Sequence, residues 1–393
     1  MVVLPDFTPQ EVEPVKILMI GNGFDLAHKL PTSYMDFLNF IKLINKFSKN
    51  DIGEYEWNNL NLFPDLMSIY DKLHPFCRLC IENYVKGGKI NPIITKFLNL
   101  INCNIWIELF NKDLKENNQN WIDFESEISN FVQEFEKAFN DITKTHKKPE
   151  DYMLFFKIFT NEFKKYVNKD ELQEYKGKML SDLNRLIDAF EIYLVECVEK
   201  IDIDEFLPDI KNQNFEYVLS FNYTNTYERL YAAHRRDAIS PEYDYIHGKI
   251  NNKPNNIVLG ISEYLKDEEK DTNTDYIEFK KYFQRIHKKT GCQYKKWLKT
   301  IKDNDLEAEL YILGHSLDAT DGDIIKELMM FPKIKTTIYY HSTEAYGKQI
   351  ACLVKILGQD NLIEMVHEEP PKIVFKEQKA LSPFILPRTP ISV

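Results

Sequence analysis

A short apolar run followed at once by two glycines constrains the fold of this chain more than any other feature. Residues 16–20 (KILMI) predict a buried strand, and Gly21-Asn22-Gly23-Phe24-Asp25 follows it directly. The residues after this turn can enter a helix. A strand, a glycine turn and a helix open a nucleotide-binding α/β unit, because glycine lets a phosphate approach the backbone N–H groups at the helix start. We therefore expect residues 21–25 to contact a nucleotide.

One departure from the usual dinucleotide fingerprint narrows this prediction. Hydride-transfer enzymes have a third glycine, and the corresponding position here is Leu26. A standard dehydrogenase is therefore disfavoured. The alternative is that the two glycines serve only the geometry of a strand-to-helix turn.

The first strand is not followed by a second one. From about residue 34 to about residue 207 apolar residues recur with helical spacing, as Phe131, Phe135 and Phe139 illustrate. A parallel sheet needs only one helix between neighbouring strands. We therefore predict an α-helical insertion over residues 34–207.

Strand patterns return after the insertion and alternate with loops and helix-sized segments. They lie at residues 217–221, 243–246, 257–261, 310–313, 336–340 and 362–366. This alternation predicts an α/β fold, with a Rossmann-like and mostly parallel sheet formed by residues 15–33 and 208–367. Five prolines after residue 368 predict an extended C-terminal tail over residues 368–393.

Composition excludes several classes of function. The formal net charge of -11 disfavours a general binder of the nucleic-acid backbone. The first fifteen residues contain no Lys or Arg, and no apolar run approaches the length of a membrane span. We therefore expect a cytoplasmic protein with no membrane partner. Cys77 and Cys80 are a lone close pair without the second pair of a zinc site, so no metal is expected.

Polar residues and one glycine follow three of the predicted strands, at the sheet edge where ligands of open α/β sheets bind. These candidates are Asn222, Thr224, His247, Gly314, His315 and Ser316. Asn222 can both donate and accept hydrogen bonds, and a histidine can exchange protons near pH 7. The alternatives are a turn or helix cap at Asn222 and a purely structural histidine at position 247.

Charged segments elsewhere have two or three interpretations each. Asp318, Asp321 and Asp323 are expected to cap a helix, and their spacing does not match a Ca²⁺ loop. Residues 280–299 hold eight basic and no acidic residues. We favour a helical pair with a solvated basic face for this segment. The alternatives are a nucleic-acid site and a surface that attracts an anionic dinucleotide. Glu125 either lies in the first turn of a helix or reaches the cleft between insertion and sheet.

Several ordered motifs resemble the bacteriophage abortive-infection AbiH family. They comprise MIGNGFDLAH at residues 19–28 with LPTSY at 30–34, and the segments 121–125, 221–226, 246–248, 257–260 and 313–317. The resemblance runs from about residue 17 to 345. The family is in turn similar to sirtuin-like NAD-consuming domains.

The resemblance implies a sirtuin-like NAD-binding core that carries the helical insertion. It places residues 21–25 in the NAD loop, matches Asn222 and His247 to the ribose-contacting Asn and the catalytic His, and puts Gly314 and Ser316 beside the adenosine half. Thr224 stands where that class has Asp. The four-cysteine zinc module of deacylating sirtuins is absent, so protein deacylation is not expected.

The function implied by the resemblance is anti-phage defence through hydrolysis of NAD, the substrate, at its nicotinamide–ribose bond. In this hypothesis the glycine loop binds the pyrophosphate, Asn222 holds ribose or water, and His247 acts as base. A homo-oligomer or a phage-derived trigger is expected to control the activity. A non-catalytic sensor of NAD or ADP-ribose is the alternative, and Thr224 is the residue that favours it.

Overall fold

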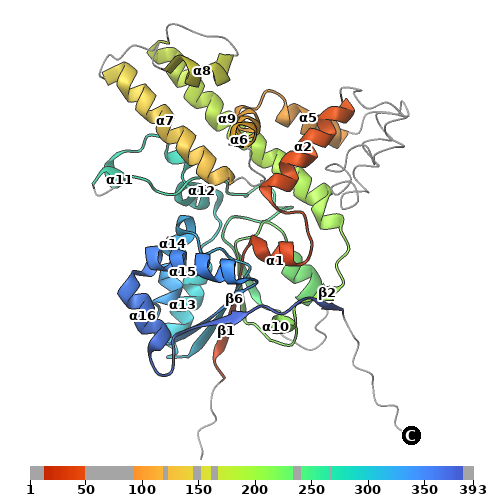
Figure 1. The fold of residues 1–393 in the computed structure, drawn as a ribbon, viewed down its shortest axis with the longest axis vertical. Helices are drawn as coiled ribbons and strands as arrows, with labels where there is room; N and C mark the ends of the chain where they lie inside the picture. Colours follow the sequence, from red (N-terminus) through yellow and green to blue (C-terminus); the bar gives the residue numbers. More distant parts are fainter. Residues whose placement is uncertain are drawn as a thin grey trace, which may run out of the picture.

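The computed structural model describes residues 13–48, 92–117, 123–144, 152–160, 167–232, 240–265 and 268–383. Its centre is a six-stranded parallel sheet (Figure 1). The strands are β1 (Val15–Ile20), β3 (Tyr217–Ser220), β4 (Glu242–Tyr245), β5 (Ala308–Leu313), β6 (Ile334–Tyr340) and β7 (Ile373–Glu377). The predicted α/β class with a parallel sheet is confirmed.

The strand order is β4-β3-β1-β5-β6-β7. Counted along the chain, this is the order 3-2-1-4-5-6 of dinucleotide-binding Rossmann folds. The direction of winding reverses between β1 and β5, which pair along their whole length from Val15–Ala308 to Ile20–Leu313. Ligands of open α/β sheets bind outside the carboxyl ends of the strands at such a switch point. The Gly21 turn and Gly314 both lie there.

Both faces of β1 are buried, which explains why it is a continuous apolar run rather than an alternating one. Ile17 and Met19 pack into the layer formed with α13 (Tyr294–Asp303), α14 (Gly322–Met329), α15 (Thr343–Leu357) and α16 (Gln359–His367). Leu18 and Ile20 pack into the opposite layer, which includes Phe24 from α1 (Asn22–Ala27) and Ile210 from α10 (Pro208–Lys211).

Helices separate β1 from β3 in the chain. They are α2 (Tyr34–Ser48), α5 (Pro92–Ile101), α6 (Ile105–Asn117), α7 (Phe124–Lys144), α8 (Met153–Thr160) and α9 (Lys169–Glu196). Figure 1 shows them gathered at one end of the molecule, beyond the sheet. Their interior is rich in aromatic side chains, and the fully buried Trp106 donates its indole N–H to the carbonyl of Met179 over 2.9 Å. This region has a hydrophobic core separate from the two layers on the sheet.

The long helix α9 illustrates why these sequences are helical. The Asn168 side chain accepts from the backbone of Glu171, whose carboxylate accepts in return from the backbone of Asn168, so the helix begins with a complete capping box. Leu183, Leu186 and Phe190 are buried at helical spacing. Within the described residues, no single helix has the length and apolar character to cross a membrane, although the bent pair α5 and α6 passes that test when taken together.

Two of the predicted strands are wrong. Residues 362–366 belong to α16, because Leu362 and Met365 are buried three positions apart while Ile363 is 51% exposed, which is the period of a helix. Residues 257–261 join no strand of the sheet and form only one bridge, between Ile261 and Lys280. The apolar side chains of this segment are nevertheless buried, and Ile257, Leu259 and Ile261 belong to the core of the helical region.

The segment expected as an extended tail contributes to the sheet. Ile373–Glu377 forms β7 beside β6, and the Ile373 side chain is buried. Farther on, β8 (Ser382–Pro383) pairs antiparallel with β2 (Glu205–Phe206). The close cysteine pair at positions 77 and 80 lies outside the described residues.

Candidate functional site

The loops that follow β1, β3, β4 and β5 meet at the carboxyl edge of the sheet. The Phe221 ring contacts the rings of both His247 and His315, with centroid distances of 5.5 and 4.4 Å. A Cβ atom on Gly21 would come within 2.8 Å of His315. The loops expected around positions 21, 222, 247 and 314 are therefore brought together.

The glycines of the first loop serve a close approach between two backbone segments. Gly314 has a φ of +64°, and a Cβ atom there would lie 2.0 Å from the Phe24 nitrogen. The Gly23 N–H donates to the Gly314 carbonyl over 2.7 Å, and the Phe24 N–H donates to the Gly21 carbonyl over 2.8 Å. These two N–H groups, which the sequence suggested for phosphate binding, are thus already engaged. The side chain of Asn22 accepts from Thr32 over 2.6 Å.

A buried polar group joins the loops after β1 and β3. Thr224 donates its hydroxyl to Asp25 Oδ2 over 2.5 Å, and Asp25 is 1% exposed. The other oxygen of Asp25 and both amide atoms of Asn222 have no hydrogen-bond partner among the described residues. Burial raises the pKa of Asp25 to about 6, although Thr224, Thr226, Arg229 and the nearby Asn222 amide oppose the rise. Three buried polar atoms thus have no hydrogen-bond partner among the described residues here.

A second polar group surrounds Asp321, the last residue of the short 3₁₀ helix η6 (Ala319–Asp321). His247 Nε2 lies 3.1 Å from Asp321 Oδ1, and His315 Nε2 lies 3.8 Å from Asp321 Oδ2. Burial disfavours the Asp321 charge, but Lys281 and His247 outweigh that effect and hold the pKa of Asp321 well below its usual range. Burial lowers the pKa of His315 to about 4 against the attraction of Asp321, so His315 is neutral near pH 7.

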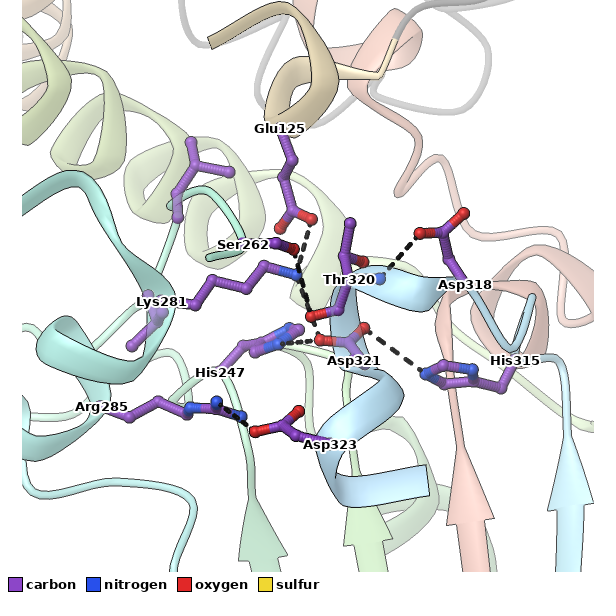
Figure 2. A network of polar contacts seen from close by, with 12 residues as sticks. Glu125, His247, Ser262, Lys281, Arg285, His315, Asp318, Thr320, Asp321 and Asp323 are labelled. Carbon is purple, nitrogen blue, oxygen red and sulfur yellow. Dashed lines mark hydrogen bonds and ion pairs between the residues drawn. The ribbon is translucent and has the colours of Figure 1, made fainter. Parts of the chain in front are cut away.

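Lys281, in α12 (Lys281–Lys288), connects this group to the helical region. Its Nζ lies 2.6 Å from Glu125 Oε2 and 3.1 Å from Asp321 Oδ1 (Figure 2). Burial alone lowers the pKa of Lys281, but the two carboxylates outweigh it and the net change is upward. Figure 2 shows Glu125 descending from α7 toward Lys281 and Asp321, which lie above the strand ends. Glu125 lies in the first turn of α7 and also reaches between the insertion and the sheet, so both interpretations of this residue hold.

The charged segments correct the sequence analysis in two places. Residues 280–299 do contain a helical pair, α12 and α13, but Lys280 and Lys281 are 0% and 3% exposed and cannot belong to a solvated face. Asp318 caps η6 by accepting from the Thr320 N–H, as predicted, whereas the Asp321 side chain makes no cap hydrogen bond and forms ion pairs instead.

The family model for bacteriophage abortive infection AbiH matches residues 17–340. The chain belongs to the AbiH family. This membership supports an anti-phage abortive-infection role. No curated protein and no solved structure matches the chain.

The matched range of the AbiH family contains the converging loops and the Asp321 group, but not Gln349. Gln349 was missed by the sequence analysis, because a lone glutamine inside a helix carries no motif. Its Nε2 lies 3.3 Å from both the His315 and the Tyr339 carbonyls, and its Oε1 has no hydrogen-bond partner among the described residues. It adds a third side chain with an unpaired polar atom to this edge of the sheet. Ser316, by contrast, is exposed.

A hollow of about 490 Å³ opens beside the carboxyl end of β4 in this AbiH protein. Its lining includes Asn225, Tyr245, Lys249 and Gln293, and none of the predicted site residues. The support for a site at Asn222 and His247 therefore comes from their polar groups and not from this hollow. Across the described part of the chain, no group of three or more His, Cys, Asp or Glu residues is arranged to hold a metal ion.

Proposed function

We propose that this AbiH protein acts in abortive infection by cleaving NAD at the nicotinamide–ribose bond. The observation that carries the proposal is the buried Asn222 amide beside the Asp25 carboxyl group at the switch-point edge of the sheet, where the amide lowers the pKa of Asp25 but neither of its polar atoms reaches a partner with good hydrogen-bond geometry. Each buried polar atom left unpaired costs on the order of 1–3 kcal/mol. Such a cost is expected where a ligand supplies the missing partners.

The order of the strands supports a dinucleotide as that ligand. The order of this sheet is the one that binds dinucleotides across the end of its first and fourth strands, which here are β1 and β5. We assign the nicotinamide ribose to the side of Asn222 and His247, and the adenosine half to the side of Gly314, His315 and Ser316. NAD is a substrate in this proposal, not a resident cofactor.

The proposed reaction breaks the bond between ribose C1′ and the nicotinamide nitrogen and forms a bond from C1′ to a water oxygen. Nicotinamide leaves as a neutral molecule, because it is cationic within NAD. The other products are ADP-ribose and one proton, which His247 accepts from the water. The transition state resembles an oxocarbenium ion, so an ionised Asp25 beside the ribose stabilises its positive charge. General-base catalysis contributes roughly 10²–10⁴-fold.

A sensor that binds NAD or ADP-ribose without cleaving it is the second candidate. Thr224 favours this candidate, because it stands where the sirtuin-like class has Asp and its hydroxyl is committed to Asp25. The engaged N–H groups of Gly23 and Phe24 leave less of the glycine loop for the pyrophosphate in either candidate. Both candidates predict binding of the dinucleotide, and only the first predicts release of nicotinamide.

The test is chromatography of nicotinamide and ADP-ribose after incubation of the full chain with NAD. It is run with purified protein and with extracts of phage-infected cells that express it, because a trigger or an oligomer is expected to control the activity. Asn222→Ala and His247→Ala should reduce nicotinamide release by at least about 100-fold. Asn304→Ala and His367→Ala, which change exposed residues of the same types, should not. Full release from both site variants, or no release in either setting, contradicts the proposal.

A further inference from the structure

Three charged side chains from separate parts of the chain are buried together. The Lys281 side chain is 3% exposed, Asp321 is 9% exposed and Glu125 is 12% exposed. Glu125 belongs to the first turn of α7 in the helical region, Lys281 to α12, and Asp321 to η6 beside the sheet. This cluster is a direct charged contact between the helical region and the catalytic edge proposed above (Figure 2).

Packing alone does not explain this cluster. Taking an ammonium and two carboxylates out of water is expensive, and apolar side chains of similar volume often fill such a space equally well or better. Buried ionic groups with altered protonation also gather at functional sites. Here burial raises the pKa of Glu125 against the attraction of Lys281, whereas the pKa of Asp321 is lowered. The two carboxylates bound by one lysine are therefore not equivalent.

Asp321 is the carboxylate that touches His247. Its Oδ1 is shared by Lys281 Nζ and His247 Nε2, each at 3.1 Å, and its Oδ2 faces His315. The Leu317 N–H donates to His315 Nδ1 over 2.9 Å, so the proton of the neutral His315 is on Nε2. An ionised Asp321 holds the His247 proton on Nε2 in the same way. The lone pair needed to accept a proton from water is then on Nδ1 of His247.

Glu125 decides how strongly Lys281 competes for the shared oxygen. While Glu125 is ionised, the Lys281 ammonium divides its attraction between two carboxylates. Without the Glu125 charge, Lys281 interacts more strongly with the shared oxygen of Asp321, and the hydrogen bond between that oxygen and His247 becomes weaker. The other groups around His247 include the rings of Phe221 and Tyr223, the neutral His315 and the more distant carboxylate of Glu125. Of these, none makes a hydrogen bond to the His247 ring among the described residues, as Asp321 does.

We infer that Asp321 and Lys281 are positioning residues for His247, and that Glu125 makes this positioning depend on the helical insertion. The inference rests on the proposed NAD cleavage for its catalytic meaning, but not for the hydrogen bond itself. An event that moves α7 away from the sheet changes the environment of His247 without touching the substrate. The insertion is thereby a control element for the site.

The test is nitrogen NMR of the full chain labelled in its histidine rings, with the His247 signals identified by their loss in His247→Gln. The neutral His247 ring of the wild type should carry its proton on Nε2. Glu125→Gln and Asp321→Asn should both shift the His247 ring signals. Both should also lower kcat for nicotinamide release by at least about tenfold, with KM changed by less than about twofold. Glu134→Gln, which removes an exposed carboxylate from the same helix, should change neither.

The outcomes separate this inference from the proposed function. Unchanged His247 signals in both Glu125→Gln and Asp321→Asn overturn the positioning role, whatever the activity on NAD. Shifted signals in a protein that never releases nicotinamide uphold the positioning role and overturn the proposed reaction. If a melting curve shows that Glu125→Gln does not fold, Glu125→Asp keeps the charge on a shorter side chain. It should give a smaller shift of the same signals, and no shift would overturn the inference.

Discussion

Thr224 donates its hydroxyl to the carboxylate of Asp25 over 2.5 Å, across 199 positions of the chain. The contact ties the loop after β3 to the glycine loop after β1, on two neighbouring strands of the sheet. An acidic group therefore lies beside Asn222 even though Thr224 replaces the acid expected two residues after it. The acid is supplied by α1, which follows the neighbouring strand β1, rather than by the loop after β3.

The raised pKa of Asp25 predicts a dependence of stability on pH. The unfolded chain releases this proton near 3.8 and the folded protein near 6, so the ionised form is disfavoured by folding. The free energy of unfolding therefore falls as pH rises from about 4 to about 6, by roughly 3 kcal/mol for that difference in pKa. Asp25→Asn should match the wild type below pH 4 and exceed its free energy of unfolding above pH 6. Denaturant titrations across this range measure the difference.

The exposed Asp303→Asn is the control for that experiment, and it should show no such pH-dependent gain. A gain for Asp25→Asn that is equal at all pH values would mean that the carboxyl group does not titrate in this range.

The unpartnered amide of Asn222 predicts a conflict between stability and function. Asn222→Leu replaces it with an apolar group of similar shape and removes two unsatisfied buried atoms. We expect the free energy of unfolding to rise by about 1 kcal/mol while NAD cleavage is lost. The matched control is Asn104→Leu. Asn104 is also buried, but it bonds to the Asp182 carbonyl and the Trp106 N–H, so its loss should cost about 1–3 kcal/mol. Equal destabilisation in both variants would mean that the Asn222 amide does have hydrogen-bond partners in the folded protein.

Much of the sheet was predictable because most of its strands contain short apolar or β-branched runs, as in β1 and β5. β1, β3, β4, β5 and β6 begin within two residues of their predicted positions. The run Leu362–Val366 was wrongly predicted as a strand, because five mostly apolar residues fit a strand as well as half of a short helix. Residues 257–261 were wrongly predicted as a strand for another reason. The segment is buried, but its N–H groups bond to a carbonyl in a loop and to a glutamine side chain, as at Val258 and Leu259.

The candidate site was predictable only where it follows a strand. Asn222 and His247 stand directly after apolar runs, so the rule for parallel sheets points to them. Glu125, Lys281 and Asp321 come together through the packing of the helical region on the sheet, and no spacing in the sequence encodes that contact. Lys281 was hidden in a basic run, where composition favours an exposed surface.

The close contact between the Gly23 loop and the Gly314 loop predicts that one added methyl group lowers the stability of the protein strongly. Gly314→Ala forces a positive φ on alanine and a clash with the Phe24 nitrogen, so it should cost at least about 2 kcal/mol in stability. Gly177→Ala is the control, because Gly177 lies within α9 and a Cβ atom there would meet nothing within 4 Å. It should stabilise the protein by about 0.5–1 kcal/mol. Thermal unfolding distinguishes the two, and a tolerated Gly314→Ala would show that the loops can separate at little cost.

The buried Lys281 predicts strong coupling between the insertion and the core. Lys281→Met leaves the buried carboxylates of Glu125 and Asp321 without their cation, which should cost about 3–5 kcal/mol. Glu125→Leu leaves Lys281 with one carboxylate and should also destabilise. The double variant removes the whole pair between insertion and core, so its cost should be smaller than the sum of the single costs by roughly 1–3 kcal/mol.

The exposed pair Lys295–Glu327, separated by 3.1 Å, is the control for that double-mutant cycle. Its side chains are 60% and 39% exposed, so water screens their attraction and the same cycle should give a coupling of only about 0–1 kcal/mol. Chemical denaturation of the four proteins in each cycle provides the comparison. The interaction energy of an ion pair appears as the difference between the cost of the double variant and the sum of the two single costs. A coupling at Lys281 no larger than at Lys295 would therefore mean that the buried contact does not hold the insertion on the sheet.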